Sequence, residues 1–164
     1  MAPATASLTP FNSPLETGIR ALIVLAEAYP AALDLQRILE YDYLIVHSGD
    51  FEGPPSLHPA LPLRSGELLV RRQLIERGLL LIMSRGLIER LASDTGLSYR
   101  ADEAAGPFLD ALSAAYLKDL KLRAKWVIST FGLMSDADIK KTLSKVYDQW
   151  TREFQLYEGP GIAS

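Results

Sequence analysis

Apolar residues recur every three or four positions along several stretches of this chain, which is the spacing of helices that bury one side. At the first of these stretches Ser13 precedes Pro14, and Glu16 follows three positions after the serine. A serine cap, a proline in the first turn and a glutamate at this distance together predict a helix start. A second helix is expected from Asp34, as its cap, to about His47.

The middle of the chain combines a third helix with two short strands. The helix is expected over about 65–84, with Gly78 as a bend or an end and Gly86 as a left-handed terminator. Residues 87–91 and 97–101 flank a Ser-Asp-Thr-Gly turn, and apolar and polar residues alternate in the second segment. This pattern predicts a β-hairpin.

Further helices are expected at the C-terminal end. Ser113 is the expected cap of a helix that ends at Gly132, and Ser135 is the expected cap of the last helix. The last helix carries an apolar stripe at helical spacing, made of Ile139, Leu143, Val146, Trp150 and Phe154. Such a stripe requires a partner. It either folds back on the preceding helix as an antiparallel pair or docks, in part, on another subunit.

The fold class predicted from this order of elements is mainly α with a small β-hairpin, as in a winged helix-turn-helix domain followed by C-terminal helices. The expected divisions are a disordered arm over 1–12, a winged-helix-like domain over 13–113, a C-terminal helical pair over 114–157 and a tail over 158–164. In a winged helix the hairpin is the wing, and the helix before it can enter the major groove of DNA.

The segment from His47 to Arg64 interrupts the helical pattern with two glycines and four prolines. A loop of this length inside a compact domain is typically either functional or disordered. Prolines reduce the conformational freedom of the unfolded chain. We therefore expect the loop to be ordered and to pack on the domain or on a partner.

Composition narrows the class of protein. The chain has no cysteine, which excludes disulfides, thiolate metal sites and a cysteine nucleophile. The first ten residues lack the pattern of a secretory signal, and the most apolar short run, Gly78 to Met83, is far below the roughly 20 residues that span a bilayer. A soluble, cytoplasmic protein without a membrane partner is expected.

The charged residues are unevenly distributed. The chain has a net charge of −3, but the segment from 64 to 100 contains seven arginines and only four acidic residues. A basic stretch of this kind can contact a phosphate backbone. The candidate nucleic-acid-binding residues are Arg64, Arg71, Arg72, Arg77 and Arg85. The alternative is a solvated helix face of mixed charge.

Catalytic chemistry has few candidates. The two histidines, His47 and His58, lie near Asp42 and Asp50 in the sequence, but a triad is built from residues that converge in space. Their spacing fits no common metal-ligand pattern, and no phosphate-binding or dinucleotide-binding motif is present. We expect the histidines to hydrogen-bond the loop backbone, and we predict no catalytic residue, no metal site and no cofactor.

Aromatic side chains offer a second kind of candidate site. Aromatic residues are enriched in the cores of protein interfaces. The candidate partner-binding residues are Tyr41, Tyr43, His47, Phe51, His58, Trp150 and Phe154. Ordinary packing inside the domain is the alternative.

Six stretches of the sequence resemble the middle components of bacterial ABC-three-component systems, a group that overlaps Lamassu-type anti-phage defence. These stretches are Phe11–Glu16, Leu33–Arg37, Asp42–Asp50, Pro54–Pro59, Arg64–Arg72 and Met83–Ile88. The resemblance implies a small accessory subunit between an ABC ATPase of the SMC or Rad50 type and an effector that is often a nuclease. It implies no catalytic residues.

Three functions are therefore compared. The first is a non-catalytic subunit of an ABC ATPase defence complex that binds protein and, as a further possibility, double-stranded DNA. The second is a free-standing winged-helix transcription regulator, for which a more basic recognition helix is expected. The third is an enzyme built around His47, His58 and Asp50.

Overall fold

The structure, a computed structural model, describes residues 13–58 and 67–157 of the chain. The expected arm over 1–12, the expected tail over 158–164 and Arg64 lie outside the described residues. The elements are, in chain order, α1 Pro14–Ala28, β1 Leu33–Asp34, α2 Leu35–Val46, the 3₁₀ helix η2 Ser48–Phe51, α3 Glu67–Met83, β2 Ile88–Ser93, β3 Gly96–Ala101, α4 Ala105–Asp110, α5 Ala115–Phe131, α6 Asp136–Thr142 and α7 Ser144–Tyr157.

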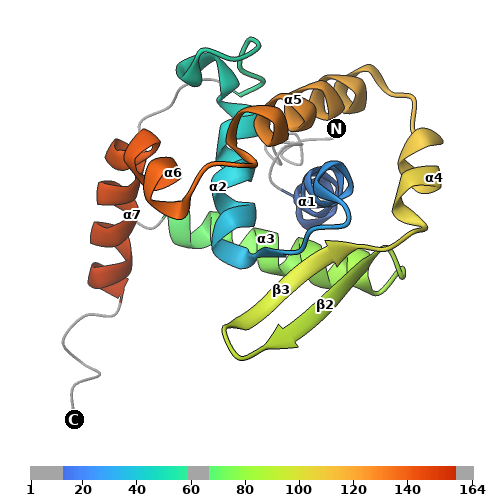
Figure 1. Ribbon diagram of the computed structural model, residues 1–164, viewed down its shortest axis with the longest axis horizontal. Helices are drawn as coiled ribbons and strands as arrows, with labels where there is room; N and C mark the ends of the chain where they lie inside the picture. Colours follow the sequence, from blue (N-terminus) through green and yellow to red (C-terminus); the bar gives the residue numbers. More distant parts are fainter. Residues whose placement is uncertain (1–12, 59–66, 158–164) are drawn as a thin grey trace, which may run out of the picture.

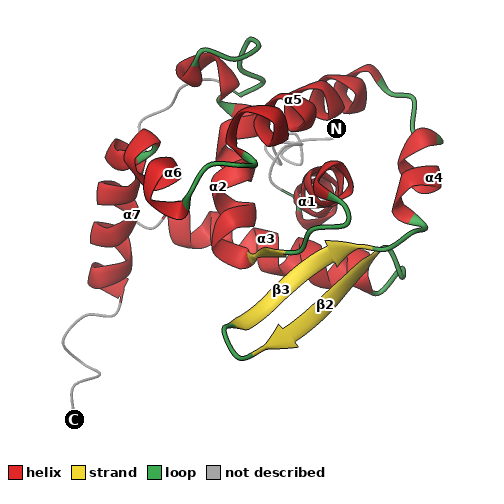
Figure 2. Cartoon of the chain, in the orientation of Figure 1, coloured by secondary structure: helices red, strands yellow, loops and turns green. Residues whose placement is uncertain are grey.

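The three strands form one small antiparallel sheet in the order β1–β3–β2 (Figure 2). The predicted hairpin is present as β2 and β3, with its turn between Ser93 and Gly96. Strand β1 was not expected from the sequence, because it has only two residues and exists through pairing of Leu33 with Tyr99 of β3. The predicted fold class, mainly α with a small hairpin, is confirmed.

Helix starts were predicted well where a side chain caps the helix. The side-chain oxygens of Ser13, Asp34 and Ser135 each accept a hydrogen bond from the backbone N–H three residues later, at 2.8–3.1 Å. These bonds satisfy N–H groups that the helix itself leaves unpaired. The cap expected at Ser113 is not used, because α5 is preceded by Ala114 and has no side-chain cap.

Helix α1 lies at the centre of the molecule, with α2, α3, α5 and the hairpin around it (Figure 1). It packs most extensively against α3 and α5. Its Leu22 and Leu25 are fully buried, as are Ile38 of α2 and Ile75 of α3. No helix among the described residues combines the length and the hydrophobicity needed to cross a membrane.

Helix α3 passes through Gly78 without a break, so the bend or end expected there is wrong. The reason is a close crossing of two helices. A Cβ atom on Gly78 would lie 2.6 Å from the backbone nitrogen of Gly18 in α1, and one on Gly18 would lie 2.6 Å from the Gly78 carbonyl oxygen. Glycine at both positions lets the two backbones touch.

The C-terminal part differs from the expected helical pair. The single last helix expected from Ser135 is divided into α6 and α7 at Leu143. Helix α5 buries Leu120 and Val127 against α1 and α2, so its apolar side belongs to the common core. Helix α7 packs on α3, and its buried Trp150 contacts α2 instead of pairing along α5.

Candidate functional site

Helix α2 carries a carboxylate into the interior of the domain, where two arginines meet it. Arg20 of α1 donates from Nε to Asp42 Oδ1 at 2.7 Å and from Nη2 to Oδ2 at 3.3 Å. Arg71 of α3 donates from Nη1 to Asp42 Oδ2 at 2.8 Å. We call Arg20, Asp42 and Arg71 the buried charge cluster. It joins the three helices that make up most of the core.

The charges in this cluster are held fixed near neutral pH. Burial alone raises the pKa of Asp42, but the positive charges of Arg20 and Arg71 outweigh burial, and the pKa lies below its usual value. Asp42 is therefore ionised, and it is poorly suited to exchange a proton at pH 7. Breaking such a buried pair is costly, because one partner is left charged and unpaired. The cluster thus serves to join helices.

The two histidines lie next to each other beside this cluster. The ring of His47 is 4.6 Å from the ring of Tyr43 and 6.3 Å from that of His58. His58 Nε2 lies 3.3 Å from the Tyr116 hydroxyl of α5, which is a side-chain contact where a backbone contact was expected. Burial, and then the charge of Arg20, lower the pKa of His58 to about 4, so the ring is neutral at pH 7.

The residues of the enzyme hypothesis do not form a working triad. Asp42 lies near His58 but is bound by two arginines, and Asp50 is exposed on η2. Across residues 13–58 and 67–157, no three His, Cys, Asp or Glu side chains are grouped so that they could hold a metal ion.

The loop that follows α2 is tied to α5. Arg123, itself buried, donates from Nε and Nη2 to the carbonyl oxygen of Pro55 at 3.0 and 2.6 Å. Gly53 lies against the indole of Trp126, where an added Cβ would come within 2.4 Å of the ring. Ser48 Oγ closes the loop on Pro54 O at 2.8 Å. The expected ordered, packed loop is confirmed for 48–58, and the remainder lies outside the described residues.

The aromatic candidates mostly contact one another inside the molecule. Tyr43 makes edge-on contacts with Phe51 at 6.2 Å and with Trp150 at 6.3 Å, and Tyr41 and Trp150 are each 2% exposed. These contacts fix α7 to α2, so the packing alternative accounts for them. The indole N–H of Trp150 is buried without a hydrogen-bond acceptor among the described residues. The side chain of Phe154 lies outside the described residues.

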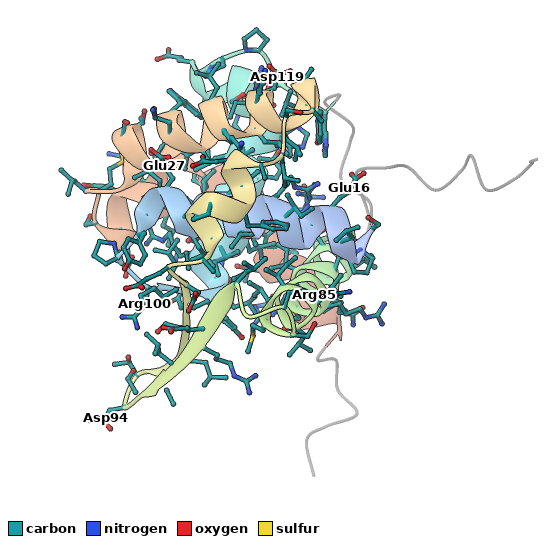
Figure 3. The ribbon with its side chains drawn as sticks, turned by 90° about the vertical axis from the view of Figure 1, so that its right-hand side faces the viewer. Glu16, Glu27, Arg85, Asp94, Arg100 and Asp119 are labelled. Carbon is teal, nitrogen blue, oxygen red and sulfur yellow. The ribbon has the colours of Figure 1, made fainter. Side chains whose placement is uncertain are left out.

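The candidate arginines of α3 separate into inward and outward residues. Arg71 points inward to Asp42, and Arg72 is 3.5 Å from Glu76 on the helix surface. Arg77 and Arg85 are exposed, and neither forms an ion pair within the part of the chain that the structure describes. Figure 3 shows Arg85 at the end of α3, beside the base of the hairpin. Only the outward residues are available to an anionic partner.

A second polar site lies where the start of α2 meets the start of α6. Arg37 forms ion pairs with Glu40, at 3.3 Å, and with Asp136 beside a shallow pocket of about 250 Å³. Burial raises the pKa of Glu40 to about 7 although Arg37 lowers it, and the charges of Asp34 and Asp136 add to the rise. One carboxylate oxygen of Glu40 is buried without a hydrogen-bond partner among the described residues. This site connects α6 to the core.

Two features went unnoticed in the sequence. Arg20 interrupts the apolar run of the first helix, and a lone charge within a buried stripe indicates a buried ion pair. Val70 and Leu80 of α3 are 54% and 55% exposed. The available signal was that apolar residues occur on all sides of this helix, which is typical of a helix that is covered on all sides.

Comparison with known proteins gives one informative match. Neither a curated protein nor a solved structure matches this chain. The family model described as ABC-three component (ABC-3C) system Middle Component 2 matches residues 10–153. That span includes the buried charge cluster, the anchored loop, the hairpin and most of α7. The chain therefore belongs to the family of ABC-3C system middle components of type 2.

Proposed function

We propose that this chain is a non-catalytic accessory subunit that bridges an ABC ATPase and an effector in an anti-phage defence complex. The observation that carries this proposal is the family match over residues 10–153, since a middle component works with the other components of its system. The ATPase is proposed to be of the SMC or Rad50 type, the effector to be a nuclease, and the system to be Lamassu-like, as the sequence resemblance implies.

The proposed architecture is a winged helix over residues 13–113, with helices added at its C-terminal end. Its support is the chain order helix, strand, helix, helix, strand, strand, together with the strand order β1–β3–β2. The connection between α2 and α3 is longer than the tight turn of a helix-turn-helix, and its described part is fixed to α5. The hairpin would be the wing.

The proposed absence of catalysis is supported by the contacts of Asp42 and His58, the side chains best suited to acid–base chemistry. Asp42 forms ion pairs with Arg20 and Arg71. His58 is neutral at pH 7 and contacts Tyr116. In this arrangement both side chains contribute to packing. The function that remains for the chain is to bind other macromolecules.

Double-stranded DNA is a second proposed partner, favoured by two exposed arginines: Arg77 on α3, and Arg85, which Figure 3 shows beside the base of the hairpin. Phosphate contacts make affinity fall steeply with salt, with a slope proportional to the number of contacts. Two unpaired arginines supply few contacts, and for this reason the free-standing transcription regulator is the weaker alternative.

The test is co-expression of this chain with the ATPase and the effector encoded beside it. We expect the three proteins to co-elute in size-exclusion chromatography, and we expect cells without this chain to lose protection against phage. If the chain never co-elutes with either protein, the bridging role is wrong. The regulator then becomes the leading hypothesis, and specific binding of a duplex from its own promoter region is the result that it requires.

A further inference from the structure

The side of α3 that faces away from the core carries apolar side chains in water. Val70 and Leu80 are 54% and 55% exposed, while Ile75 on the opposite side is fully buried. Positions spaced by three or four residues share one side of a helix. The outer α3 face is therefore made of Val70, Gln73, Arg77 and Leu80, together with Ser84 just after the helix, all of them exposed. Leu69, Leu74 and Leu81 are half-buried at its borders.

The charge on this face is positive. Arg77 lies between the two exposed apolar residues, Arg85 lies just beyond the end of the helix, and neither is in an ion pair with another described residue. At one border Arg72 and Glu76 neutralise each other. The chain as a whole has a net charge of −3, so the sign of this face is opposite to that of the total charge.

The hairpin that packs beside α3 adds a further exposed apolar position. Side chains alternate between the two sides of a strand, so Leu97 shares a side of β3 with the buried Tyr99 and Ala101. Leu97 is nevertheless 50% exposed. The reason is visible in Figure 3, where the hairpin extends beyond the helices and carries Asp94 at its tip.

This composition fits protein better than DNA. A helix that reads the major groove needs side chains that hydrogen-bond base edges, and arginine, lysine, asparagine and glutamine are the usual choices. Here Val70 and Leu80 are two of the five residues of the face, and phosphates and base edges offer them little apolar surface. Apolar area gains free energy only when it is buried against other apolar area.

We propose that the outer α3 face binds an acidic amphipathic helix of a partner protein, with apolar side chains on Val70 and Leu80 and carboxylates on Arg77 and Arg85. Leu80 lies ten positions after Val70, which is about 15 Å along a helix. The partner helix therefore needs about three turns. This inference rests on the proposed function, because the partner is taken to be another component of the ABC-3C complex.

The experiment measures binding of this chain to its co-purified partner components by surface plasmon resonance. Leu80→Glu and Arg77→Glu place negative charge on the face. Leu122→Glu is the matched control, because Leu122 is 58% exposed and belongs to α5, a helix that lies across α1 from α3 (Figure 1). We expect each α3 variant to weaken binding by about 30-fold or more, the range of a hot-spot residue. The control is expected to weaken binding by less than about threefold. Arg77→Lys is expected to retain most of the affinity.

A photoreactive amino acid in place of Leu80, in the assembled complex, identifies the occupant. We expect mass spectrometry to find a cross-link to a partner segment with a net negative charge and apolar residues at helical spacing. A cross-link to a second copy of this chain would overturn the proposal. The proposal would also be overturned if Leu80→Glu bound the partner as well as the wild-type chain does. It would be overturned as well if Arg77→Glu lost binding to a 30-base-pair duplex but still bound the partner protein. Each of these results leaves the bridging role standing, whereas failure of the wild-type chain to bind any component removes both.

Discussion

Helix α3 contributes to two regions that use the same types of residue in opposite ways. In the buried charge cluster Arg71 is half-buried and is paired with the buried Asp42. On the outer α3 face Arg77 is exposed and unpaired among the described residues, and its apolar neighbours Val70 and Leu80 are exposed as well. The inner region stabilises the fold, and the outer region is available for binding.

The comparison shows why a count of arginines is a poor guide to a binding surface. Arg71 and Arg72 are adjacent in the sequence, yet Arg71 reaches the buried Asp42, whereas Arg72 pairs with Glu76 on the surface of the helix. What decides their role is whether a carboxylate from another helix lies within reach. The exposed apolar residues of α3 indicate a partner more directly than its charges do.

The largest effect is expected from breaking the inner region. Asp42→Asn keeps the shape of the side chain but leaves Arg20 and Arg71 without their counter-charge. Loss of one partner of a buried ion pair typically costs about 3–5 kcal/mol. We expect a decrease of this size in the free energy of unfolding, measured by urea denaturation followed by circular dichroism. Asp94→Asn, at the exposed tip of the hairpin, is the control and should behave as the wild-type chain does.

The next effect is expected where α1 and α3 cross. In Gly78→Ala the new methyl group would lie 2.6 Å from the backbone of Gly18, so the helices must separate. Overpacking costs about 1–3 kcal/mol, and rigid backbone places this case at the upper end. Gly106→Ala in α4 has open space around the methyl group and is expected to be neutral or stabilising. Equal melting temperatures of the two variants would contradict the close crossing.

A smaller effect is expected on the pH dependence of the free energy of unfolding, to which Glu40 and His58 contribute in opposite directions. Glu40 has a pKa of about 7 in the folded protein against 4.5 when exposed, so the folded state holds an extra proton between these values. The stability gained in this way is present at low pH and is lost as the pH rises through 7. His58 acts in the opposite direction, because its pKa falls from 6.5 to about 4 on folding, and its contribution is lost as the pH falls.

Single variants should reveal these opposite changes of the free energy of unfolding with pH. For Glu40→Gln we expect the free energy of unfolding to rise between pH 4.5 and 6.5, and for His58→Gln we expect it to fall over the same range. Each change should be about 1–2 kcal/mol, given about 1.4 kcal/mol per pKa unit and partial screening by solvent. Urea titrations at several pH values measure it. Parallel profiles for both variants would show that these groups do not control the dependence.

The smallest effect on stability is expected from the outer α3 face. Leu80→Glu and Arg77→Glu alter exposed side chains, and such substitutions usually change the free energy of unfolding by less than about 0.5 kcal/mol. Thermal denaturation of the isolated chain measures this directly. A large loss of stability would mean that Leu80 belongs to the core and that the division between the two regions is wrong.

Local features of the fold were predictable from the sequence, because they depend on residues close together in the chain. The caps at Ser13, Asp34 and Ser135 and the left-handed conformation of Gly86 after α3 belong to this kind. The features that escaped prediction depend on distant partners. Asp42 meets Arg71 across 29 positions, and Gly78 meets a glycine 60 positions earlier in the chain, a contact that no local pattern reveals.

The candidate site was predicted less well than the fold. The sequence assigned a binding role to the arginines near α3 as a set, because the exposure of each side chain depends on how the helix is turned toward the core. Trp150 illustrates the same limit. Its place in an apolar stripe was visible, but the sequence does not tell whether such a stripe is covered by Tyr43 of the same chain or by another protein.

The hydrogen bonds from Arg123 to Pro55 link the N-terminal and C-terminal parts of the chain, so the two parts are expected to be inherited together. A gene fragment that ends at residue 113 encodes every strand and the helices α1 to α4, yet it lacks the side chains that hold the loop after α2. Recombination at that boundary would give a protein whose α2 and α3 are connected by an unanchored segment. Functional exchange between related systems is therefore expected to transfer the two parts together, and chimeras that join the halves of two different parents near residue 113 should lose function.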